Sequence, residues 1–351
     1  MVKNFIKNTD YGALFHKAID LYEKIERENS REAEINNISM GYLEFGSNDG
    51  TPLIWAHGSG SSSYEILNVQ AGLVEAGYWV IAIDYRGHGR TQIDINSQNT
   101  SLYHIADDIS ALMDHLDIDK AIVGGLSKGG CVAAIFYDTY PKRVLGLLLE
   151  DGGSFSNLRL KEDIRLNVVQ PGPMPYPIEA VKRLYDTTIR YKDRFEGLQD
   201  VLAACSPAVK AATSATVEYI TMCLSFLRQE ENGMWVYHCD GWRYFLGESG
   251  RNVGEGTTSA VLYSRLPLMQ QSQELMIPSV VFRNLNVPMH IIDPVSPVDW
   301  LPVRHLNEEL HALHPGLIVH EVYDYEHSPH EAHLERPRRF IESAKALLKR
   351  I

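Results

Sequence analysis

The feature that most constrains the fold is a serine flanked by glycines, Gly125-Leu126-Ser127-Lys128-Gly129. The apolar run 121–123 before it is typical of a buried strand, and the apolar pattern 131–136 after it is typical of a helix. A G-x-S-x-G motif between a strand and a helix predicts a turn so tight that only glycine fits on both sides. Such a turn exposes the serine hydroxyl beside a helix N-terminus, where backbone N–H groups can stabilise an oxyanion. Ser127 is therefore the candidate nucleophile.

Strands and helices alternate on both sides of this motif. Apolar runs at 52–56, 78–83, 120–124, 144–149 and 288–292 predict strands, and patterns near 64–75, 103–116 and 128–139 predict helices. This alternation predicts an α/β fold, with a mostly parallel sheet covered by helices on both faces. Residues 34–45 predict two short strands joined at Asn36-Asn37.

Three further segments stand at positions consistent with this motif: His57-Gly58-Ser59-Gly60, Asp84-Tyr85-Arg86-Gly87-His88-Gly89, and residues 330–337. Over residues 33–153 and 287–351, with these signatures, the sequence resembles the α/β-hydrolase superfamily. The resemblance implies a catalytic serine, aspartate and histidine in that chain order. It also implies an oxyanion hole formed by the backbone N–H groups of Ser59 and Lys128. The side chain of Lys128 is expected on the surface, at the start of a helix.

The resemblance favours His330 as the base, because the superfamily's catalytic histidine commonly precedes a histidine by three residues, a glutamate by five and a proline by seven. His333, Glu335 and Pro337 give His330 this spacing, and His327 is the alternative. His330-Glu331-Ala332-His333 is one residue too short for the H-E-x-x-H zinc motif, so no metal is expected. No cofactor is expected either.

The acid is expected to follow the strand at 288–292. Asp299, shortly before Pro302, fits the superfamily's acid position, and Asp293 is the alternative. Asp151 is a weaker third choice. Asp84 and Asp108 are expected to be structural, and the loop of Arg86 and His88 is expected to brace the sheet.

Composition restricts the partners. A net charge of −12 over 351 residues argues against nucleic acid and against anionic membranes. The four cysteines form no C-x-x-C pair, and neither a signal-peptide core nor a membrane-spanning run is found. We therefore expect a cytoplasmic protein that acts on a small-molecule substrate, with a homo-oligomer left open.

Three parts are predicted along the chain. Residues 1–32 form an N-terminal helical extension, with an amphipathic helix over about 11–29. Residues 33–153 and 287–351 form the core, and residues 154–286 form a mainly helical cap over the site. The cap is expected to contain helices near 178–204 and 208–229 and a hairpin at Asp240-Gly241. Its aromatic residues Trp235, Tyr237 and Trp242 are candidates for binding an apolar substrate.

These features together predict an enzyme that hydrolyses a carboxylic ester or lactone of a small or mid-sized apolar substrate through an acyl-serine intermediate. The same triad can also serve carbon–carbon bond hydrolysis, acyl transfer or cofactor-free peroxidation. A ligand receptor or scaffold is the non-enzymatic alternative.

Overall fold

The computed structural model describes residues 11–91, 93, 101–153, 194–196, 216–237, 277–295, 304–324 and 331–351. Their centre is an eight-stranded sheet in the order β1-β2-β4-β3-β5-β6-β10-β11. The strands are β1 (Ser30–Ile35), β2 (Ile38–Phe45), β3 (Thr51–Ala56), β4 (Tyr78–Ile83), β5 (Ala121–Leu126), β6 (Val144–Glu150), β10 (Met289–Val295) and β11 (Ile318–Asp324). The pairs β1–β2 and β2–β4 are antiparallel, and all later pairs in this order are parallel. The predicted α/β class is confirmed.

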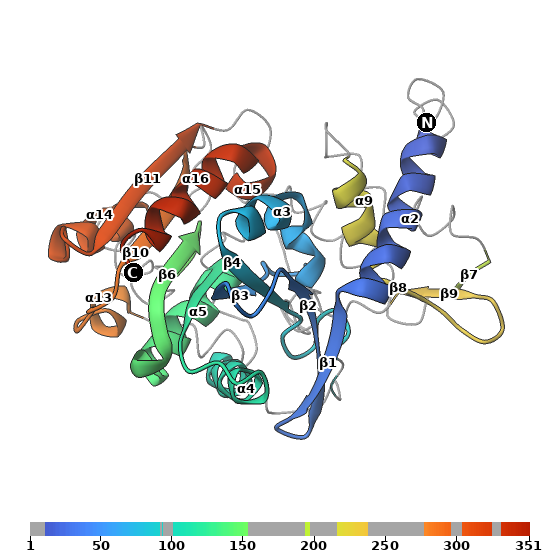
Figure 1. Cartoon of the computed structure of the whole chain (residues 1–351), viewed down its shortest axis with the longest axis horizontal. Helices are drawn as coiled ribbons and strands as arrows, with labels where there is room; N and C mark the ends of the chain where they lie inside the picture. Colours follow the sequence, from blue (N-terminus) through green and yellow to red (C-terminus); the bar gives the residue numbers. More distant parts are fainter. Residues whose placement is uncertain are drawn as a thin grey trace, which may run out of the picture.

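Helices cover both faces of the sheet, as Figure 1 shows. One face packs against α4 (Leu102–His115) and α5 (Lys128–Thr139), and the other against α3 (Leu67–Glu75) and α16 (Pro337–Leu348). In β3, Ile54 points to the first core and Leu53 and Trp55 to the second. Because both sides of these strands are buried, their sequences are almost continuously apolar rather than alternating.

Short helices complete these two layers around the sheet. The 3₁₀ turn η1 (Ser63–Ile66) precedes α3, and η2 (Pro141–Arg143) precedes β6. Near the C-terminus lie α13 (Pro278–Val281), α14 (Arg304–Leu313) and α15 (Ala332–Glu335).

The helix and the hairpin predicted near the N-terminus are confirmed, although β1 begins at Ser30 rather than at residue 34. Helix α2 spans Tyr11–Glu28. The turn between β1 and β2 has φ 46° at Asn36 and 61° at Asn37, the left-handed pair that a two-residue hairpin requires and asparagine tolerates.

The segment predicted as a helical cap contains both helix and strand. Helix α9 (Val217–Leu224) confirms part of the helix predicted near 208–229, but residues 227–229 form the strand β8 (Leu227–Gln229). β8 pairs with β9 (Trp235–Tyr237), which also pairs with β7 (Arg194–Phe195), a strand inside the helix predicted near 178–204. Cross-strand pairing therefore overrides the helical periodicity at these positions. The Asp240-Gly241 hairpin lies outside the described residues.

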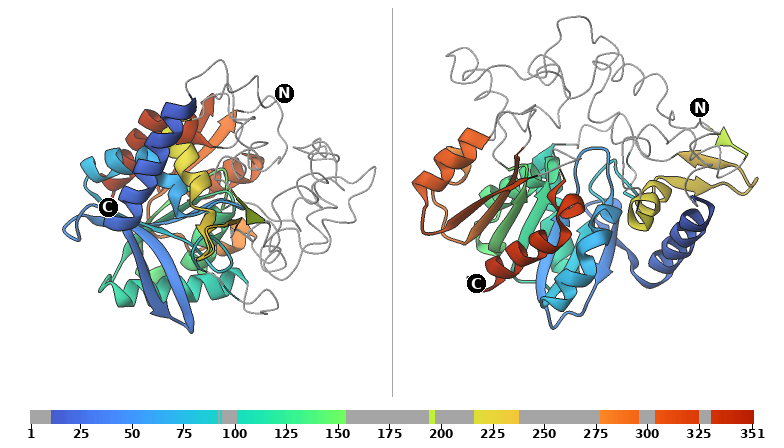
Figure 2. Two further views of the ribbon diagram at one scale, coloured as in Figure 1. Left: turned by 90° about the vertical axis from the view of Figure 1, so that its right-hand side faces the viewer. Right: turned by 90° about the horizontal axis from the view of Figure 1, so that it is seen from above.

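Helix α9 lies beside α2, and the small sheet lies next to them at the edge of the molecule (Figures 1 and 2). The Thr221 hydroxyl of α9 donates to the carbonyl of Ala18 in α2 at 3.2 Å. Within the described part of the chain, Cys131 and Cys223 are buried and belong to no disulfide, and none of the helices could span a bilayer.

Candidate active site

Ser127 forms the turn between β5 and α5. Its backbone has φ 53° and ψ −111°, a strained conformation for a residue with a side chain that costs about 1–3 kcal/mol. Its N–H donates to the carbonyl of Glu150 at the end of β6 (2.8 Å), and its side chain remains partly exposed. The hydroxyl therefore sits at the N-terminus of α5, as the motif predicts.

The glycines of the motif are required by contact. A Cβ atom at Gly125 or at Gly129 would overlap the carbonyl oxygen of Ala56 at the end of β3. A Cβ atom at Gly152, after β6, would likewise overlap the carbonyl oxygen of Ser127. The turn is thus clamped between the ends of β3 and β6, and no larger residue fits at these positions.

The loop that carries Ser59 leaves β3 next to this turn, because Ala56 pairs with Gly125. Ser59 is partly exposed. Lys128 is the first residue of α5, but the expectation that its side chain is on the surface is wrong: it is 3% exposed. Burial lowers the pKa of Lys128 to about 8. Lys128 is buried because it begins a helix whose first ten residues are all buried.

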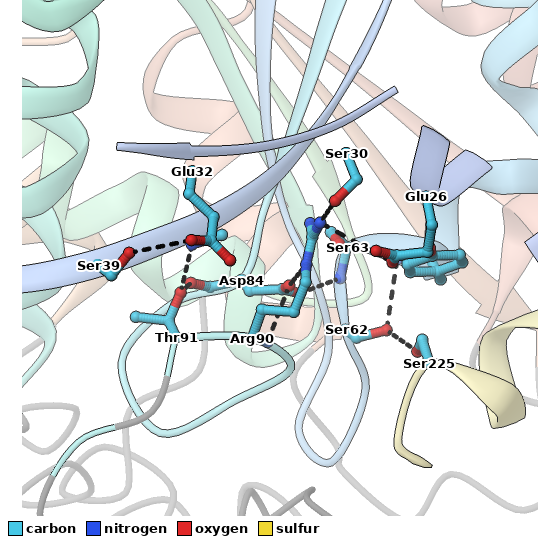
Figure 3. A network of polar contacts seen from close by, with 12 residues as sticks. Glu26, Ser30, Glu32, Ser39, Ser62, Ser63, Asp84, Arg90, Thr91 and Ser225 are labelled. Carbon is cyan, nitrogen blue, oxygen red and sulfur yellow. Dashed lines mark hydrogen bonds and ion pairs between the residues drawn. The ribbon is translucent and has the colours of Figure 1, made fainter. Parts of the chain in front are cut away.

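A polar network binds the end of the Ser59 loop, where the chain enters η1 (Figure 3). The backbone N–H of Ser63 donates to the carboxylate of Asp84 at 2.6 Å, and Arg90 forms an ion pair with that carboxylate at 3.2 Å. Arg90 also lies 3.9 Å from Glu26 of α2. Asp84 is therefore structural, as expected.

Two contacts join this loop to more distant segments. The Tyr64 hydroxyl donates to Glu26 at 2.5 Å, and the Ser62 hydroxyl lies 2.8 Å from that of Ser225, directly after α9. The N-terminal helix and the segment 217–225 are thus both attached to the loop that contains Ser59.

Arg86 and His88 brace the end of β4. The Arg86 guanidinium binds Asp108 of α4 through two hydrogen bonds of 2.5 and 2.8 Å. The ring of His57 stacks on Tyr85 at 4.0 Å, and His88 lies against both rings. Burial lowers the pKa of His57 and of His88 to about 3, so both rings are neutral at pH 7.

Of the candidate acids, Asp293 is described and Asp299 lies outside the described residues. Asp293 is 2% exposed in β10. Its carboxylate accepts hydrogen bonds from Asn307 at 2.8 and 2.9 Å and from His320 at 2.7 Å. Asp151 has φ 41° and its N–H donates to Ile292 at 2.8 Å. Asp293 therefore joins β10 to α14 and β11, whatever its further role.

The candidate bases His327 and His330 lie outside the described residues, but the chain that follows them is fixed. His333 is fully buried, and its backbone N–H donates to the side chain of Glu150 at 2.9 Å. Glu150 is also the residue whose carbonyl binds Ser127.

The aromatic candidates of the inserted segment are only partly described. Trp235 is half-buried in β9, Tyr237 ends the same strand, and Trp242 lies outside the described residues.

Comparisons with known proteins agree with this architecture. The family model of the α/β-hydrolase fold matches residues 51–172. The solved structure of E-2-(acetamidomethylene)succinate hydrolase superposes with a TM-score of 0.61 at 17% identity, covering 91% of this chain and 98% of that one. The described residues therefore have the α/β-hydrolase fold, and residues 51–172 match that family by sequence.

The curated relatives of this α/β-hydrolase match over shorter stretches. The dihydrolipoyllysine-residue acetyltransferase component of the acetoin cleaving system of Pseudomonas putida is 35% identical over 119 residues, which are 34% of this chain and 31% of that protein. An uncharacterized hydrolase of Bacillus subtilis strain 168 is 35% identical over 123 residues, which are 34% of this chain and 41% of that protein. The matched stretch is thus less than half the length of either relative.

Sequence reasoning missed the burial and pairing of three polar residues. Glu65 and Glu150 are 5% and 0% exposed, and His333 is bound to Glu150. One signal was present: Glu150 directly ends the apolar strand run Leu147–Leu149, where a carboxylate is costly unless it is paired.

We expect Gly129→Ala to prevent formation of the Ser127 turn, because the added methyl group would overlap the Ala56 carbonyl. The protein should lose several kcal/mol of stability, as overpacked sites with fixed backbone neighbours do. Gly316→Ala is the matched control, since nothing lies within 4 Å of the added Cβ atom there. Thermal unfolding of both variants checks this, and equal melting temperatures would contradict the packing argument.

Proposed function

We propose that this α/β-hydrolase cleaves a carboxylic ester or lactone through an acyl-serine intermediate, with Ser127 as nucleophile. The observation that carries the proposal is the strained, partly exposed Ser127 at the N-terminus of α5. A backbone strained at one residue is retained where the surrounding structure enforces it, and such positions cluster at active sites. The resemblance of the chain to other hydrolases supports the same reaction class.

In this proposal the Ser127 hydroxyl attacks the substrate carbonyl while His330 takes its proton. Asp299 orients the imidazole and stabilises its charge. The backbone N–H groups of Ser59 and Lys128 bind the oxyanion, and His330 then returns the proton to the leaving group. A water molecule then attacks the acyl-serine carbonyl while His330 takes its proton, the bond to the Ser127 oxygen breaks, and His330 returns the proton to that oxygen, so the carboxylic acid leaves without a cofactor.

The substrate is proposed to be small or mid-sized and apolar, with Trp235, Tyr237 and Trp242 as contacts. A panel of esters, lactones and diketones separates ester hydrolysis from carbon–carbon bond cleavage. Inclusion of an acyl acceptor and of peroxide tests acyl transfer and peroxidation.

The direct test is Ser127→Ala. This variant should lose both turnover and covalent labelling by a fluorophosphonate, because the attacking oxygen is gone, while its melting temperature stays near that of the wild type. Labelling is read by intact-protein mass spectrometry. Wild-type labelling that survives in Ser127→Ala would reject the nucleophile, and a wild type that is never labelled would favour a receptor or scaffold.

The base assignment is tested by two histidines in the same segment. His330→Ala should lower kcat by several orders of magnitude, as loss of a triad base does, whereas His327→Ala should have a much smaller effect. Steady-state kinetics on one activated ester compares them. If His327→Ala is the inactive variant, the spacing to Glu335 and Pro337 has selected the wrong histidine.

The acid assignment predicts opposite effects for two aspartates. Asp299→Asn should reduce kcat strongly, because an amide favours the wrong tautomer of His330. Asp293→Asn should instead mainly lower stability, by about 1–3 kcal/mol, because its carboxylate accepts buried hydrogen bonds from Asn307 and His320. Rates and denaturant midpoints of both variants decide this, and a stable, fully active Asp299→Asn would move the acid to Asp293.

A further inference from the structure

Three titratable side chains form a buried cluster on the α3 and α16 side of the sheet, outside the proposed triad. Glu150 ends β6, His333 lies in α15 and Glu65 lies in η1. The ring Nδ1 of His333 lies 2.9 and 3.1 Å from the two carboxylate oxygens of Glu150, and the His333 backbone N–H donates to the same carboxylate. Glu150 and His333 are both 0% exposed.

Glu65 extends the cluster to the loop after β3. Its Oε2 accepts the backbone N–H of Gly58 at 3.0 Å, and its Oε1 accepts the indole N–H of Trp55 at 3.4 Å. Gly58 directly precedes Ser59, the proposed oxyanion donor. A carboxylate on η1 therefore fixes the peptide next to the one that would bind the oxyanion.

The charge of His333 is set by these neighbours. Burial alone would lower the pKa of His333, but the carboxylates of Glu150, Glu65 and Glu331 outweigh it and raise that pKa to about 9. Burial raises the pKa of Glu65 to about 7, against the opposing effects of the His333 charge and the Gly58 N–H. The rings of Trp55 and Phe340, which carry no charge, also lie against the ring of His333, and the side-chain amide of Asn68 donates to the His333 carbonyl. At neutral pH the cluster thus contains a buried imidazolium bound to a carboxylate.

Each member of the cluster adjoins one part of the proposed machinery. The backbone carbonyl of Glu150 accepts the N–H of Ser127 at 2.8 Å. His333 follows His330 by three residues, and Glu65 binds the residue before Ser59. Glu150 therefore holds the nucleophile through its backbone and the segment of the proposed base through its side chain.

We propose that Glu150, His333 and Glu65 are positioning residues. They hold the reacting groups of Ser127, His330 and Ser59 at fixed positions relative to one another. This inference rests on the proposed function. A buried ion pair is weak evidence for stability, because desolvation offsets its attraction, and the ring Nε2 of His333 has no hydrogen-bond partner among the described residues. What several hydrogen bonds to one carboxylate fix is the geometry of the groups that donate them. Here the carboxylate of Glu150 accepts from both a ring and a backbone N–H, so a shift of α15 would break two bonds to one group.

The kinetic test uses Glu150→Ala, with Glu150→Gln as the conservative variant. Misplacement of reacting groups by about 1 Å costs about 10²-fold, so Glu150→Ala should lower kcat for 4-nitrophenyl acetate and the rate of fluorophosphonate labelling by about that factor, with little change in KM. Glu150→Gln keeps an oxygen that accepts the His333 N–H and should recover part of the loss. His333→Gln should resemble Glu150→Ala.

Ser343→Ala is the matched control for loss of a buried polar contact. The hydroxyls of Ser343 in α16 and Tyr323 in β11 lie 2.5 Å apart, and Ser343 is not one of the residues proposed to act on the substrate. This variant should lose stability and keep the wild-type kcat well below its melting temperature. If the Glu150 and His333 variants behave in the same way, the positioning role is wrong. If Glu150→Ala does not fold, Glu150→Gln and His333→Gln decide the same question.

The charge in the cluster is tested by pH. Because the pKa of His333 is raised on folding, the stability from its pairing is fully present below about pH 6.5 and is lost as pH rises through about 9. The difference in melting temperature between the wild type and His333→Gln should therefore shrink between pH 6.5 and 9.5. A difference that does not change with pH would contradict the ion pair.

Failure of the inference can be told from failure of the proposed function. A reactive wild type with unchanged Glu150 and His333 variants contradicts only the positioning role. If the wild type reacts with neither 4-nitrophenyl acetate nor the fluorophosphonate, and so behaves as Ser127→Ala is expected to, the proposed function and the inference are both contradicted.

Discussion

The proposed site depends on one contact, that between the backbone of the Ser127 turn and the end of β3. Gly125 and Gly129 lie against the Ala56 carbonyl so closely that a methyl group would not fit. This contact places the serine beside the loop of Ser59, because both leave neighbouring parallel strands at the same edge of the sheet. The strain at Ser127 is offset by α5, whose first ten residues are all buried and hold the helix against the sheet.

Features encoded locally could be predicted from the sequence, and features decided by distant partners could not. The Asn36-Asn37 turn and the serine motif each require a particular residue at a particular backbone angle, so a few letters suffice. The burial of Lys128 and the strand β8 depend on what packs against them. The apolar periodicity predicts a helix that includes residues 227–229, because periodicity within one segment carries no information about a partner strand.

The residues of the site also differ in whether the local sequence identifies them. Ser127 is identified by its own flanking residues. Asp299 and His330 are instead assigned from their distance along the sequence to other residues, by resemblance to a family. The cluster of Glu65, Glu150 and His333 joins residues from three distant parts of the chain, and no local pattern relates them. Only the apolar run before Glu150 indicated that a carboxylate there must have a partner.

The two faces of the sheet support the Ser127 turn by different physical means. On the α4 and α5 side, His57 and His88 are buried without a carboxylate bound to either ring in the described part of the chain, and burial lowers their pKa values to about 3. On the α3 and α16 side, His333 is equally buried but bound to Glu150, and its pKa is raised to about 9. Burial acts in the same direction on all three rings, so the carboxylate decides the charge. The sheet thus carries neutral stacked rings on one side and, on the other, an ion pair that binds the segment following His330 to the end of β6.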